Sequence, residues 1–161
     1  MITTLVGIDP GVIHTGIIVS KINPHVKEVT NSTFLMKGCP VMDIRDILRN
    51  FPSTATFIEG YRPRSNLHHD RQMQKFVSDL NFHLQNSIAL DNMDSKNVVK
   101  NDLLKLFKLY SFSTRSHHQD LRSAARIMLF GALKQNDTNA LIADVVRDTI
   151  KTPGSWDFTT K

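Results

Sequence analysis

Two acidic residues of this sequence each follow a short apolar run that predicts a buried strand. Asp9 follows residues 5–8, and Glu59 follows residues 56–58. Carboxylates at the carboxyl ends of such strands are held by a rigid sheet and point into the crevice beyond it. If the two strands are neighbours, the two charges repel each other. A divalent cation that prefers hard oxygen ligands, Mg²⁺ or Mn²⁺, relieves that repulsion.

A third acid, Asp120, begins an apolar helical segment, and His117 stands three residues before it. This spacing places both side chains on one helical face, provided that the helix begins at or before His117. Three carboxylates and an imidazole suffice to hold two metal ions in a phosphodiester-cleaving site. Each residue also has a plainer interpretation, with Asp120 as a helix N-cap and Glu59 and His117 as ordinary polar surface residues.

The elements that must position these residues follow from hydrophobic periodicity and turn residues. Residues 15–20 and 26–35 predict two antiparallel strands, because Asn23-Pro24-His25 supplies a turn between them. Apolar positions separated by four, three, four and four residues predict a helix over residues 71–90, whose apolar face packs in the core or, alternatively, forms a dimer interface. The other expected elements are a strand at 97–99 and helices at 41–48, 103–110 (capped by Asp102), 120–133 and 137–150.

Strands followed by strand–helix alternation indicate an α/β fold with a mixed central sheet flanked by helices. The 161 residues suit a single domain over residues 1–150, followed by a C-terminal tail over residues 151–161 that is expected to be loose from Pro153. Cys39 is the only cysteine, and no apolar run reaches the length of a membrane span. Residues 1–10 lack the pattern of a secretory signal. We therefore expect a cytoplasmic protein without a disulfide or a membrane segment.

The formal net charge of +5 favours a polyanionic partner. Basic residues gather directly after Glu59 and again between residues 96 and 126. Such clusters supply affinity for phosphates without reading the bases, although any single member is better explained as solvated surface than as a DNA contact. Tyr61 and Phe76 are candidates for stacking on unpaired bases or for the core. The expected DNA contacts are Arg62, Arg64, Arg71, Lys75, Lys100, Arg115 and Arg122.

Three motifs, in order across residues 1–133, resemble those of RuvC-type Holliday-junction resolvases, which are members of the RNase H-like superfamily. The opening motif is Gly-Ile-Asp-Pro-Gly at residues 7–11 with Thr15-Gly16 behind it, the second is Phe57-Ile58-Glu59, and the last is His117-His118-Gln119-Asp120. Many relatives carry Asp-x-x-Asp in the last motif. Counting forward from Asp120 gives Ser123, a poor metal ligand, so we align Asp120 with the second aspartate and His117 with the first.

The resemblance implies an RNase H-like fold and an Mg²⁺-dependent endonuclease that nicks Holliday junctions and other branched DNA symmetrically. It implies that Asp9 bridges two Mg²⁺ ions, that Glu59 and Asp120 each complete one ion's shell, and that His117 binds or orients near the scissile phosphate. Two symmetric nicks imply a homodimer and no small-molecule substrate. The compact chain and its Lys- and Asn-containing composition are compatible with a bacteriophage-encoded resolvase acting in the host cytoplasm.

Three other functions stay open at this point. An actin-like or sugar-kinase ATPase also has Gly-x-Asp-x-Gly after a strand, but such proteins need two domains of this kind. A catalytically inert junction-binding relative would explain Ser123. A ribonuclease H acting on RNA–DNA hybrids would share the acidic residues.

Overall fold

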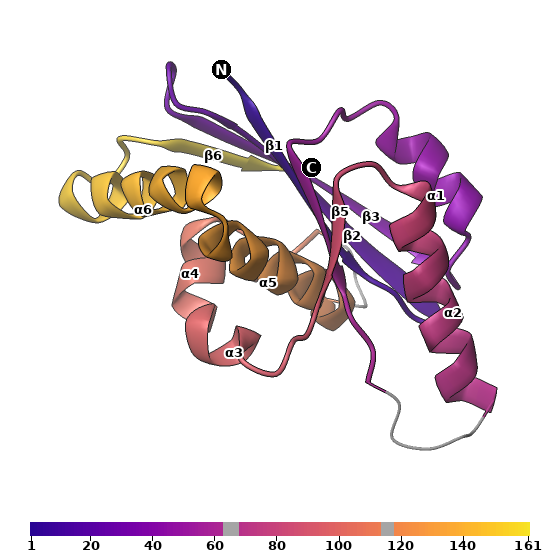
Figure 1. Ribbon diagram of the computed structural model, residues 1–161. Helices are drawn as coiled ribbons and strands as arrows, with labels where there is room; N and C mark the ends of the chain where they lie inside the picture. Colours follow the sequence, from indigo (N-terminus) through magenta and orange to yellow (C-terminus); the bar gives the residue numbers. More distant parts are fainter. Residues whose placement is uncertain (63–67, 114–117) are drawn as a thin grey trace.

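A mixed six-stranded sheet forms the centre of the computed structural model, which describes residues 1–62, 68–113 and 118–161 (Figure 1). The strand order is β5-β4-β1-β2-β3-β6. Strands β1, β2 and β3 pair antiparallel, whereas β4 joins β1, β5 joins β4 and β6 joins β3 in parallel. The strands are β1 (Thr3–Asp9), β2 (His14–Asn23), β3 (Glu28–Lys37), β4 (Ala55–Glu59), β5 (Ser87–Leu90) and β6 (Asp157–Thr160).

Helices cover both faces of this sheet, with α1 and α2 on one side and α3 to α6 on the other (Figure 1). The α/β class, the mixed sheet and the antiparallel β2–β3 pair are therefore confirmed. No helix in the described ranges is long and apolar enough to cross a membrane. The helices are α1 (Val41–Leu48), α2 (His68–His83), α3 (Ser95–Val98), α4 (Asn101–Leu106), α5 (His118–Lys134) and α6 (Asn136–Lys151).

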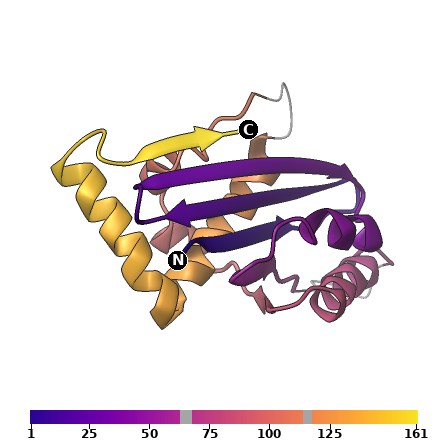
Figure 2. The same ribbon diagram turned by 90° about the horizontal axis from the view of Figure 1, so that it is seen from above.

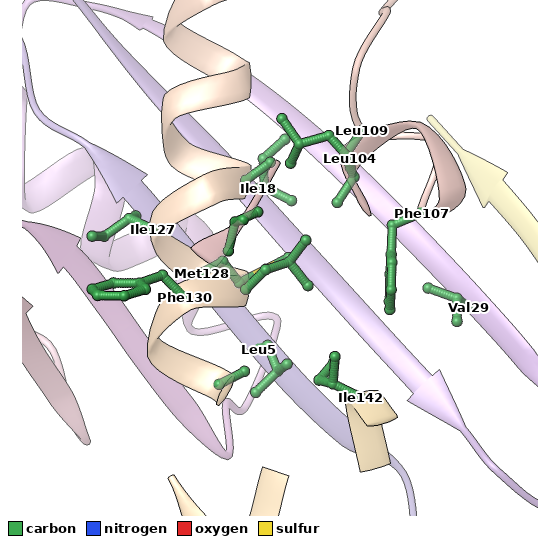
Figure 3. Close-up of a cluster of buried hydrophobic side chains, with 14 of the residues drawn as sticks. Leu5, Ile18, Val29, Leu104, Phe107, Leu109, Ile127, Met128, Phe130 and Ile142 are labelled. Atoms are coloured by element: carbon green, nitrogen blue, oxygen red, sulfur yellow. The ribbon is translucent and has the colours of Figure 1, made fainter. Parts of the chain in front are cut away.

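The larger core lies between the sheet and α5, whose middle is buried on nearly every side. Figure 3 shows Met128 and Phe130 of α5 among sheet residues such as Leu5 and Ile18. The helix lies directly on β1 because position 7 is glycine. A Cβ atom built on Gly7 would stand 2.1 Å from the carbonyl oxygen of Ala124. Any side chain at position 7 would therefore push α5 away from the sheet.

A smaller core fills the other face, where α1 and α2 cover β1 and β2. Ile44 of α1 and Leu80 of α2 are fully buried there, and Phe76 packs against the same cluster. The core interpretation is therefore confirmed for Phe76 and for the apolar face of α2.

Two predicted elements between residues 71 and 99 differ from the structure. The helix expected over 71–90 ends at His83, and β5 follows at Ser87–Leu90. Asn86, directly before β5, takes a left-handed conformation with φ of 54°, which turns the chain between the helix and the strand. The expected strand 97–99 is instead the end of α3 (Ser95–Val98) and its C-cap residue Val99, and Val99 is buried whereas Val98 is exposed.

The last part of the chain also differs from its prediction. Helix α4 ends at Leu106, because Lys108 adopts φ of 56°, and its N-cap is Lys100 rather than Asp102. The prediction that the tail is loose from Pro153 is wrong. Strand β6 pairs with β3 at one edge of the sheet (Figure 2), and Trp156 and Phe158 are buried beside it. Burial of these two aromatic side chains favours the ordered strand.

Candidate active site

Asp9 and Glu59 meet at one edge of the sheet. Strands β1 and β4 are parallel neighbours, and Ile8 lies opposite Ile58. The next residues, Asp9 and Glu59, therefore lie at the same edge of the sheet, where both strands end. The condition stated for the repulsion of the two charges, that the two strands are neighbours, is therefore met. The two carboxyl groups share a hydrogen bond, and both line a pocket of about 650 Å³.

Asp120 approaches the same edge from the first turn of α5. Its neighbour in β2 is Gly16, which pairs with Asp9 across the ladder. A Cβ atom on Gly16 would lie 2.6 Å from the carbonyl oxygen of Asp120, so only glycine lets this turn rest on the strand. Gly16 of the opening motif therefore helps to position Asp120. His117 lies outside the described residues.

Burial and neighbouring charge act strongly on Asp9. Burial, then the charge and hydrogen bond of Glu59, then the charge of Asp120 raise the pKa of Asp9 from 3.8 to about 9. The carboxyl group of Asp9 therefore keeps its proton at neutral pH when no cation is near. Crowded carboxylates of this kind provide the hard oxygen ligands that Mg²⁺ and Mn²⁺ prefer. Among the described residues, no set of three or more His, Cys, Asp and Glu side chains is already arranged as a metal site.

The end of β5 adds two polar residues that the sequence analysis missed. Asn92 donates a hydrogen bond to Oε1 of Glu59, and Asp91 forms an ion pair with Arg62. Both residues line the Asp9 pocket. The pattern of a short apolar run followed by an acid, already present before Asp9 and Glu59, recurs in residues 87–91. It was hidden because Ile88 also continues the helical periodicity of α2.

A buried acid supports the opposite wall of this pocket. Asp70, near the start of α2, is 6% exposed and accepts a hydrogen bond from the hydroxyl of Tyr61, which lines the pocket. Met73, one turn further along α2, lines the pocket as well. Tyr61 is therefore fixed by Asp70 beside the acidic residues, a role for Asp70 that no sequence pattern indicates.

The expected DNA contacts fall into two regions. Arg62 and Lys75 are exposed but ion-paired, Arg62 with Asp91 and Lys75 with Asp79 at 2.6 Å. Lys100 and Arg122 line a separate hollow of about 530 Å³ on the α5 side of the sheet. Arg71 is exposed on α2. Arg64 and Arg115 lie outside the described residues.

The strand order and the helices on both faces define an RNase H-like fold, as predicted. Comparison with solved structures narrows the fold further, because the chain has the fold of RuvC. Thermus thermophilus RuvC in complex with a Holliday junction substrate matches with a TM-score of 0.57 and 17% identity, over 80% of this chain and 90% of that chain. A further Thermus thermophilus RuvC structure gives 0.53 and 18%, over 91% and 97%.

The nuclease of the large terminase from thermophilic phage G20c matches with a TM-score of 0.49 and 11% identity, over 80% of this chain and 82% of that chain. No family model matches the sequence, and the search of curated proteins gave no match.

Proposed function

We propose that this protein is a metal-dependent endonuclease that resolves Holliday junctions and other branched DNA by paired symmetric nicks. The observation that carries the proposal is the meeting of Asp9 and Glu59, with Asp120 close enough to act on Asp9, on a RuvC-like fold. One RuvC structure of this fold holds a Holliday junction substrate, which makes a four-way junction the first substrate to test.

Asp9, Glu59 and Asp120 would hold Mg²⁺, two ions per site, and Mn²⁺ would substitute. Their chemistry fits this role, because all three are carboxylates, and burial followed by the charges of Glu59 and Asp120 raises the pKa of Asp9. When bound, the metal supplies positive charge that stabilises the phosphodiester transition state. Asn92 holds Oε1 of Glu59 through its amide and so limits the rotation of that carboxylate. His117 stays a proposed fourth residue of the site.

A homodimer belongs to the same proposal, because two symmetric nicks need two sites related by a twofold axis. The apolar face of α2 is buried inside the monomer, so the proposed contact between subunits would use another surface. Sedimentation of the protein alone and bound to a junction gives the number of subunits. A monomer that nicks only one strand of each junction would contradict the symmetric mechanism.

Cleavage of an end-labelled synthetic four-way junction tests the proposal most directly. Wild type and Asp9→Asn are compared with and without Mg²⁺. Paired symmetric nicks that need both the metal and Asp9 would support resolution. Tight binding without cleavage in Mg²⁺ or Mn²⁺ would identify an inert junction-binding protein, and preferential cleavage of an RNA–DNA hybrid would identify a ribonuclease H.

A further inference from the structure

Two hollows adjoin each other on the α5 side of the sheet and share Tyr110 in their walls. The first, of about 530 Å³, has α5 as one wall. The second, of about 860 Å³, lies between the end of α4 and strand β6. Their walls contain six basic side chains, which we call the cationic tract: Lys96, Lys100, Arg122 and Arg126 in the first hollow, and Lys105 and Lys108 in the second.

The arginines of the cationic tract are held in place by backbone and aromatic partners. Nε of Arg122 donates to the carbonyl oxygen of Tyr110 at 2.6 Å, and its guanidinium carbon lies 4.2 Å from the centroid of the same ring. Nε of Arg126 donates to the carbonyl oxygen of Val99 at 3.1 Å, and Nη2 donates to Oδ1 of Asn101 at 2.9 Å. Fixed guanidinium groups lose little conformational entropy when an anion binds.

The charge of the cationic tract is not neutralised by acids. Within residues 1–62, 68–113 and 118–161, none of its six members forms an ion pair, whereas Arg62 and Lys75 each pair with an aspartate. Asp102 on α4 is exposed and forms no ion pair in those ranges either. Burial and the charge of Arg122 lower the pKa of Arg126 from its usual value. Clustered cations of this kind repel one another and favour a polyanion.

The cationic tract begins beside the acidic residues. Gln119 and Ser123, on either side of Asp120 along α5, line its first hollow, and the charge of Glu59 acts on Arg126. Its far end is fixed to the sheet. The hydroxyl of Thr160 in β6 donates to the carbonyl oxygen of Lys108 at 3.0 Å, and Nδ2 of Asn31 donates to that of Phe107 at 2.8 Å. The tract therefore connects the acidic edge with the C-terminal strand.

We propose that the cationic tract binds the phosphate backbone of a DNA arm that runs from the active site over α4 to β6. This inference rests on the proposed function and adds the path of the substrate. The binding is independent of base sequence, because lysine and arginine side chains that contact phosphate oxygens do not read the base edges. Arg122 and Lys105 already lie over the Tyr110 ring, which leaves that ring occupied. Longer arms should reach Lys105 and Lys108, whereas short arms should end before them.

The experiment measures junction binding by the inactive Asp9→Asn protein at several salt concentrations. Junction arms are about 10 and about 20 base pairs long, roughly one and two helical turns. The test variant is Lys105→Gln with Lys108→Asn, because asparagine tolerates the φ of 56° at position 108. The matched control is Lys151→Gln, since Lys151, like Lys105, stands in the last turn of a helix.

Without the substitutions, the longer arms should bind more tightly and with a steeper dependence on salt. The double variant should lose this advantage, and its slope of log Kd against log salt should fall by about 2, one for each lost phosphate contact. The Lys151→Gln control should keep both the tighter binding of longer arms and the steeper salt dependence. An unchanged slope and unchanged arm-length dependence in the double variant would overturn the inference.

Failure of this inference differs from failure of the proposed function. If wild type nicks junctions but the double variant binds them like the control, only the path over α4 is wrong. If wild type nicks no DNA but the double variant loses salt dependence, the protein uses the tract for binding and the nuclease function is wrong. If wild type, Asp9→Asn, the double variant and the Lys151→Gln control all fail to bind DNA, both the inference and the proposed function are overturned. Equal thermal melting of the variants excludes misfolding as the cause.

Discussion

Two basic regions flank the acidic edge, and they differ in how many of their described basic side chains form ion pairs. The segment after Glu59 has Arg62 paired with Asp91 and Lys75 paired with Asp79. The cationic tract has no acid partner among the described residues. In the sequence, the first region directly follows Glu59, and its lysines and arginines make it look as basic as the cationic tract. The comparison teaches that pairing in three dimensions, rather than the number of lysines and arginines, decides which surface attracts a polyanion.

The largest expected effect comes from removing the acid between the two regions. Asp9→Asn should lower the single-turnover nicking rate by at least about two orders of magnitude, because electrostatic stabilisation of the transition state is lost. Junction binding should persist, since both basic regions are intact. Asp43→Asn, on the exposed side of α1, serves as the control. A nicking rate near that of wild type would remove Asp9 from the site.

A smaller effect should separate the two regions directly. Arg122→Gln should weaken junction binding about tenfold, equivalent to about 1.4 kcal/mol, because one charge-assisted contact with phosphate is lost. Arg62→Gln should weaken it far less, since that charge is already paired with Asp91. Fluorescence anisotropy with a labelled junction measures both. Equal losses would mean that ion pairing does not distinguish the two regions.

The same comparison can be reversed with one substitution in the paired region. Asp91→Asn should release Arg62 and tighten junction binding by a few-fold, because an exposed ion pair contributes little to stability while the freed charge attracts DNA. The double variant Asp91→Asn with Arg62→Gln should bind like wild type. Weaker binding by Asp91→Asn would show instead that Asp91 supports the bound state.

The smallest effect concerns stability in a metal chelator. The raised pKa of Asp9 means that the folded chain keeps a proton between about pH 4 and pH 9 that the unfolded chain releases. Stability of the metal-free protein should therefore fall as the pH rises through this window. Asp9→Asn removes this dependence and should raise Tm by a few degrees at pH 8. Thermal melting at pH 5 and pH 8 measures it, and parallel curves for both proteins would contradict it.

Local patterns were sufficient for much of the fold. The helix over 41–48 and the turn between β2 and β3 depend on residues close together in the sequence. The ends of β1 and β4, which carry Asp9 and Glu59, are marked by apolar runs that stop at a charge. For this reason the acidic residues of the candidate site could be predicted from the sequence.

The two edge strands could not be predicted from local sequence patterns in this way. Strand β5 has four residues, and β6 has four residues whose partner β3 lies far away in the sequence. Their pairing is set by tertiary contacts rather than by local propensity. Missing β5 also hid Asp91 and Asn92. The roles proposed for His117, Arg64 and Arg115 stay predictions, because these residues lie outside the described ranges.

The contact between Gly16 and the backbone of Asp120 has a consequence for mutational tolerance. Position 16 carries no reactive atom, yet every substitution adds a Cβ where the first turn of α5 already lies. In a library that contains all single substitutions, selected for junction cleavage, position 16 should be depleted of variants as completely as position 9. A residue without a side chain would then be as restricted as the carboxylate beside it.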